Sequence, residues 1–146
     1  MSAPAGFWAD AEVIHAYTRA DAIRDGELID VTETAREAGF RWPVAMTRAV
    51  YADLVTWTDE DETRKGFTGQ DEKGRLWDVL WMARNAAQGN RGASPRRIHD
   101  GLTEFQMVRV PREGRGVRPR KATLHLGIGP GDTPAPVMTI MFPGED

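Results

Sequence analysis

Residues 120–128, with the sequence RKATLHLGI, decide the fold class because apolar and other side chains alternate along them with a period of two. The alternation places Ala122, Leu124, Leu126 and Ile128 on one face and Thr123, His125 and Gly127 on the other. It predicts a strand with one buried face. Similar patterns predict strands over residues 102–110 and 137–142, with turn-rich connections. We therefore expect a three-stranded antiparallel meander at the C-terminal end.

The sequence before these strands has mainly helical spacing. Residues 71–88 give the strongest pattern, because apolar side chains such as Leu76, Val79, Leu80 and Ala83 recur at intervals of three and four. Shorter helices are predicted over residues 19–24, 32–38 and 48–57. Short extended segments are predicted over residues 27–31 and 42–46, and polar loops over residues 58–70 and 90–101. We expect one α+β domain over residues 10–146, with N-terminal helices and one or two short strands packed on the meander, after a flexible tail over residues 1–9.

The composition restricts the class of protein. The chain has 146 residues, of which 40% are hydrophobic and 28% charged, and these values are typical of one globular domain. It has no cysteine, which excludes disulfides, thiolate zinc sites and iron–sulfur clusters and fits a reducing compartment. No basic start followed by an apolar run is present, and no stretch is long and apolar enough to span a membrane. We predict a soluble cytoplasmic protein.

The charge is unevenly distributed along the chain. Residues 91–121 contain nine of the 19 basic residues and three acids, a local net charge of +6. Residues 1–90 have a net charge of −6 and residues 122–146 one of −3, so the total of −3 conceals a basic block. A basic block between acidic regions indicates how the protein associates with partners, and it does not determine the fold.

The predicted hairpin between residues 102–110 and 120–128 carries most of this block. Gly114 and Gly116 predict a flexible tip, and the basic residues at or near it are Arg109, Arg112, Arg115, Arg118, Arg120 and Lys121. Three interpretations stay open: a solvated loop, a contact for an acidic protein surface, or a contact for phosphates. The acidic total and the lack of aromatic residues in this loop argue against a dedicated nucleic-acid binder.

Trp77 and Trp81 lie one turn apart on the flank of the helix predicted over residues 71–88. They would widen its apolar face, and the simplest interpretation is that the sheet buries them. The alternative is that one or both are exposed and anchor a partner protein, because tryptophan is enriched at interface hot spots.

No motif in the chain predicts catalysis strongly, and we predict neither a metal site nor a cofactor. The consecutive acids of residues 59–62 lack the spacing of a calcium loop. An alternative function is a small enzyme that acts on a nucleotide-like substrate, with His15, Tyr17 or His125 in its pocket. His15 and Tyr17, before an apolar helix and Gly26, resemble the nicotinamide-binding start of ADP-ribosyltransferases with compressed spacing.

Three stretches together resemble a family of small proteins carried on bacterial plasmids, phages and other mobile elements. They are residues 17–31 (YTRADAIRDGELIDV), 74–84 (GRLWDVLWMAR) and 129–146 (GPGDTPAPVMTIMFPGED). The resemblance implies a genetic setting and transfers no catalytic residue. We expect a non-enzymatic accessory protein that binds a host protein or nucleoprotein complex, with counteraction of host defence as one role. A plasmid nucleic-acid-binding protein is a further alternative.

Overall fold

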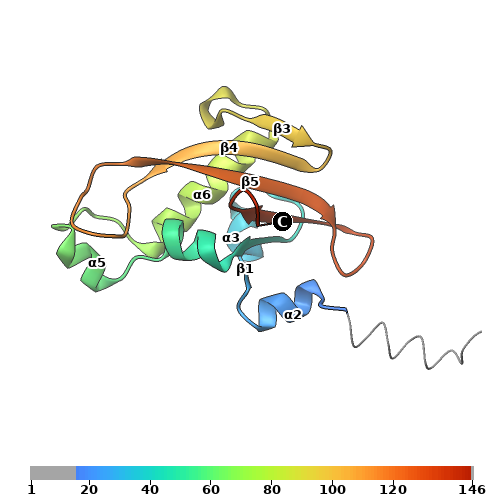
Figure 1. Ribbon diagram of the computed structural model, residues 1–146, viewed down its shortest axis with the longest axis horizontal. Coiled ribbons are helices and arrows are strands. Elements are labelled where there is room, and N and C mark those ends of the chain that lie inside the picture. Colours follow the sequence, from blue (N-terminus) through green and yellow to red (C-terminus); the bar gives the residue numbers. More distant parts are fainter. Residues whose placement is uncertain (1–15, 146) are drawn as a thin grey trace, which may run out of the picture.

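Six strands form one mixed sheet in the order β1-β2-β6-β5-β4-β3 in this computed structural model, which describes residues 16–145 (Figure 1). Neighbouring strands are antiparallel except β2 and β6, which are parallel. The strand bounds are β1 Leu28–Asp30, β2 Val44–Thr47, β3 Arg96–His99, β4 Leu102–Arg109, β5 Arg120–Pro130 and β6 Pro136–Met141. The tail predicted over residues 1–9 and His15 lie outside the described residues.

The predicted three-stranded C-terminal meander is wrong. The chain is a single α+β domain, but its C-terminal strands are the middle of a larger sheet, because β2 pairs with β6 and β3 pairs with β4. Strand β3 falls in the predicted loop 90–101. The signal for it is Asp100-Gly101, a tight hairpin turn in which Gly101 has a φ of +81°.

The helices begin at clear caps. Thr18 and Thr58 each accept a hydrogen bond from the amide three residues on and form capping boxes, and Asp71 caps the longest helix through the Gly74 amide. The bounds are α2 Arg19–Arg24, α3 Thr32–Glu37, α4 Arg48–Val50, the π-helical turn η1 Tyr51–Val55, α5 Asp59–Arg64, α6 Glu72–Ala87 and the 3₁₀ turn η2 Arg91–Ala93. Helix α6 confirms the strongest helical prediction, whereas α5 replaces part of the polar loop predicted over residues 58–70.

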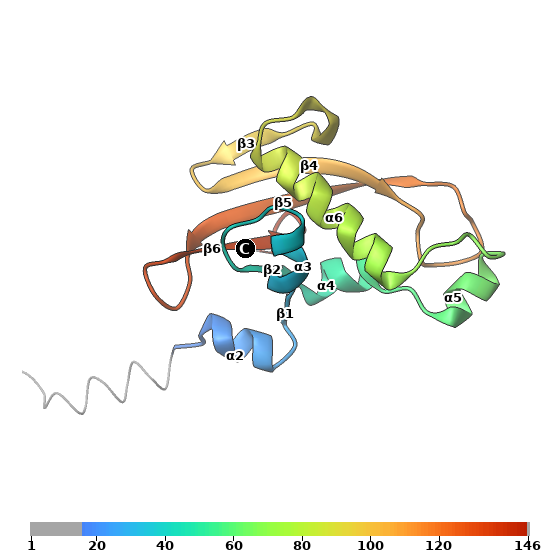
Figure 2. The ribbon, with the colours of Figure 1, turned by 180° about the vertical axis from the view of Figure 1, so that it is seen from behind.

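One face of the sheet carries the core. Helices α3, α4 and α6 lie on that side (Figure 2), and their buried side chains join those of the strands in one cluster. Its fully buried members include Met46, Leu80, Phe105, Leu124 and Ile140. Burial of this apolar surface is the main driving force for the fold.

The opposite face is partly covered by α2. Arg19 donates a hydrogen bond to Thr139 Oγ1 at 2.7 Å, and Thr139 lies between the core residues Met138 and Ile140, so its side chain points away from the core. Asp132, in the turn after β5, accepts hydrogen bonds from the amides of Arg19 and Ala20. These contacts fix the start of α2 against the β5–β6 turn.

Candidate functional site

Two of the six predicted hairpin cations form ion pairs with other residues of the protein. Arg109 pairs with Asp53 at 3.1 Å, and its side chain is only 17% exposed. Arg112 Nε donates to Asp61 Oδ2 at 2.7 Å. Both arginines therefore tie the base of the hairpin to the helical side of the molecule, and they are not available as independent contacts for a partner.

Helix α5 holds the connection between β4 and β5, which we call the hairpin loop (residues 111–119). Arg64 donates hydrogen bonds to the carbonyl oxygens of Arg112 and Gly114, at 2.6 and 2.9 Å. The Lys65 ammonium donates to the carbonyl oxygens of Glu113 and Gly116. Four bonds from two adjacent cations anchor the loop that the sequence predicted to be a flexible finger.

The polar groups beneath the hairpin loop are buried. Lys65 and Asp61 are 5% and 3% exposed. Burial lowers the pKa of the Lys65 ammonium. Burial by itself would raise the pKa of Asp61, but hydrogen bonds from the Thr58 amide, Arg112 and Arg64 outweigh it and hold this pKa far below its usual range. The acidic run of residues 59–62 is therefore the start of a helix that supports the hairpin loop, and it is not the solvated loop that the sequence predicted.

The other four predicted cations face solvent. They are Arg115, Arg118, Arg120 and Lys121, and none forms an ion pair with a residue among 16–145. A groove of about 450 Å³ lies on the hairpin loop and is lined by Arg120 and five residues of the loop, among them Arg118 and Glu113. This end of the molecule therefore presents positive charge on an anchored backbone.

Trp77 and Trp81 are exposed on the outer side of α6, and the prediction that the sheet buries them is wrong. They are 37% and 43% exposed, and their rings stack at 6.1 Å between centroids with 15° between planes. The guanidinium of Arg84 lies 5.3 Å from the Trp81 ring. A stacked, partly exposed aromatic pair is the geometry expected of an interface anchor.

The residues of the enzymatic alternative do not form one site among those described. Tyr17 is 61% exposed, and its hydroxyl donates to Asp25 at 2.9 Å. Slight desolvation and this hydrogen bond raise the pKa of the Tyr17 hydroxyl. His125 instead bonds to Glu104 on the neighbouring strand at 3.1 Å. No hydrogen bond joins these two pairs within residues 16–145.

A row of polar side chains crosses three strands on the face opposite the core. Arg96 of β3, Glu104 of β4 and His125 of β5 are register neighbours. Glu104 accepts bonds from both, at 3.1 Å each, and these bonds lower its pKa, the one from His125 most. His125 Nδ1 is buried without a hydrogen-bond partner. No local pattern in the sequence predicts the row, because Arg96 joins it only through the pairing of the unpredicted strand β3 with β4.

Within residues 16–145, no group of three or more histidine, aspartate and glutamate side chains could hold a metal ion. No helix in the same range is long and apolar enough to cross a membrane.

The comparison with family models identifies the family. The chain matches the model of a family of unknown function (DUF6573) over residues 5–146, and it belongs to that family. No curated protein and no solved structure matches the chain.

Proposed function

We propose that this family member acts by binding a host protein or nucleoprotein complex through the exposed cations of the hairpin loop and of the adjoining start of β5, as an accessory factor of a mobile genetic element. The mobile-element setting rests only on the sequence resemblance described above. The observation that carries the binding proposal is the capture of four hairpin-loop carbonyls by Arg64 and Lys65. These four hydrogen bonds support the inference that the hairpin loop is already fixed before a partner binds.

An anchored basic loop has two advantages in binding. Ordering a loop on association costs free energy, and a loop that is already fixed avoids much of that cost. Exposed positive charge also accelerates encounter with an acidic partner. Arg115, Arg118 and Arg120 lie on this anchored backbone without ion pairs among residues 16–145. An acidic protein surface is therefore the chemistry that this end of the molecule fits, and Trp77 and Trp81 are candidate aromatic anchors.

The test is quantitative affinity capture of the tagged protein from its own host, with and without nuclease, read by mass spectrometry. We expect one host protein in both halves. The variant Arg115→Glu, Arg118→Glu, Arg120→Glu should reduce its recovery at least about tenfold, because three attractions become repulsions. Arg112 is left unchanged, since its ion pair with Asp61 supports the loop.

A matched control separates local charge from total charge. The variant Arg36→Glu, Arg41→Glu, Arg97→Glu changes the net charge by the same amount at exposed positions outside the hairpin loop. It should retain the partner. Equal loss of the partner in both variants, with both proteins folded by circular dichroism, would contradict the hairpin-loop contact. Loss of every partner after nuclease treatment would instead indicate nucleic acid.

A further inference from the structure

The outer edge of β4 is only partly covered. Strand β3 pairs with β4 from Leu102 to Glu104, and the pairing ends at Arg96. Before Arg96 the chain turns away, because Ser94 has a φ of +47° and Pro95 has no N–H to donate. The second half of β4 therefore has a paired inner edge, against β5, and an open outer edge.

The register identifies which backbone groups face this open edge. The Ile128 amide donates to the Gly101 carbonyl oxygen, so Gly101 and Ile128 form a hydrogen-bonded pair at the start of the β4–β5 ladder. In an antiparallel ladder the bonded pairs alternate, so Met107 and Arg109 bond to β5 while Gln106 and Val108 point outward. Among the described residues, the N–H and C=O groups of Gln106 and Val108 have no other partner. They form a short, unused template for a further strand.

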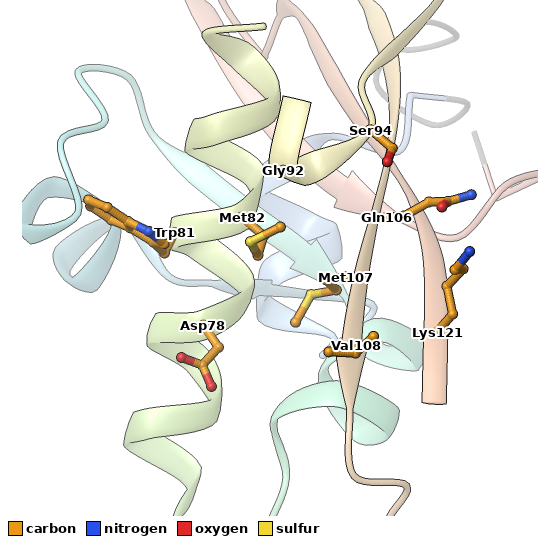
Figure 3. A pocket seen from close by; sticks show the side chains of 9 residues that line it. All are labelled: Asp78, Trp81, Met82, Gly92, Ser94, Gln106, Met107, Val108 and Lys121. Carbon is orange, nitrogen blue, oxygen red and sulfur yellow. The ribbon is translucent and has the colours of Figure 1, made fainter. Parts of the chain in front are cut away.

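A groove runs along this edge. It has a volume of about 450 Å³ and lies between α6, η2 and β4. Met82 of α6 and Met107 of β4 point toward each other across it, whereas Gln106 and Lys121 lie on the other side of β4 (Figure 3). A strand added at the edge would place alternate side chains toward Met82 and Met107. Methionine side chains adapt to apolar groups of different shape.

The charge in the groove selects the occupant. Asp78 lies on the α6 side of the groove and forms no ion pair with any residue among 16–145. Partial desolvation raises the pKa of this exposed carboxyl, and the nearby Arg75 opposes the shift only in part. Val108, which is 62% exposed, also lines the groove, from β4. A basic side chain on the α6-facing side of an added strand would complement Asp78, and an acidic one would be repelled.

We propose that the open edge of β4 binds an extended segment of another protein as an added strand, with a basic side chain of that segment paired to Asp78. The backbone of Gln106 and Val108 supplies the hydrogen bonds, as in other cases of strand addition. An apolar side chain occupies the space between Met82 and Met107. Lys121 and Trp81 also line this groove. The strand-addition proposal does not depend on their role in the proposed function.

The test is an NMR titration of the ¹⁵N-labelled full chain with two synthetic peptides, acetyl-TKTLTKT-amide and acetyl-TETLTET-amide. Both alternate in the same way and differ only in the charge of the residues that flank leucine. We expect the lysine peptide to shift the amide signals of Gln106 and Val108. It should bind about fivefold more tightly than the glutamate peptide, because Asp78 attracts lysine and repels glutamate. In Asp78→Asn this preference should disappear.

A second variant tests the backbone contact. Val108→Pro removes one outward N–H without removing a bond to β5, and it should weaken binding of the lysine peptide at least threefold while the fold is retained. No shift at Gln106 and Val108 with millimolar peptide, or tighter binding of the glutamate peptide, would overturn the proposal. Shifts of the same amides on concentrating the protein alone would also overturn it, since a second copy of the chain would then occupy the edge.

Discussion

At the scale of single residues, Asp61 organises the support of the hairpin loop. One carboxylate closes the capping box of α5 with Thr58, pairs with Arg64 at 2.7 Å in its own helix and pairs with Arg112 at 2.7 Å in the hairpin loop. The side chain is almost fully buried, so these partners replace the water that the charge has lost. Helix start and hairpin loop therefore depend on the same charge.

This arrangement predicts how stability depends on pH. The pKa of Asp61 lies far below its usual 3.8 in the folded protein, so its stabilisation is complete above pH 4 and is lost as the pH falls further. Asp61→Asn should lower the free energy of unfolding at pH 7 by about 2 kcal/mol, less than for a fully buried pair because both arginines are about one-third exposed. Urea unfolding from pH 2.5 to 7 measures both effects.

The control for this prediction lies in the same helix. Asp59→Asn removes the same charge from an exposed position of α5 and should retain the steep loss of stability in acid. If Asp61→Asn shows the same acid dependence as the unmodified protein, the ion pairs of Asp61 do not contribute to it.

At the scale of elements, β4 has two unlike edges, and proline substitutions can distinguish them. The Val108 amide faces the open edge, so Val108→Pro should change the free energy of unfolding by less than about 1 kcal/mol. The Met107 amide faces β5, so Met107→Pro removes a ladder bond and should cost about 3 kcal/mol or more. Thermal unfolding of the two variants measures the difference. Equal destabilisation would show that the register of β4 and β5 differs from the one described.

At the scale of the whole molecule, the last strand in the sequence is in the interior of the sheet. Strand β6 pairs with β2 on one side and β5 on the other, so it joins the N-terminal strands to the C-terminal ones. Its residues Met138 and Ile140 belong to the core. The halves of the sheet therefore become one domain only when the C-terminal strand is in place.

A truncated chain tests this role of β6. A protein that ends at residue 135 should show no cooperative thermal transition in circular dichroism, because the sheet would be divided and its core opened. A control with Thr139→Ser keeps β6 and should unfold cooperatively near the temperature of the unmodified protein. Cooperative unfolding of the truncated chain would mean that β6 is dispensable.

The sequence by itself determined the features that depend on neighbours along the chain. The spacing of Val79, Leu80 and Ala83 predicted α6, and the alternation of Leu124 and Leu126 predicted β5, because burial follows the period of each element. The charge pattern likewise located the basic hairpin, although not which of its arginines are exposed.

Only the tertiary structure decided the features that join distant segments. The parallel pairing of β2 with β6 joins Val44 to Met138, and no local pattern records such a partner. The same reason applies to two further features. Lys65 anchors the hairpin loop through Glu113, which lies far from it in the sequence. The row of Arg96, Glu104 and His125 likewise joins side chains from three strands. The apolar flank of α6 predicted that Trp81 is buried, but the sheet covers only the stripe that holds Leu80, so the tryptophan pair remains in contact with solvent.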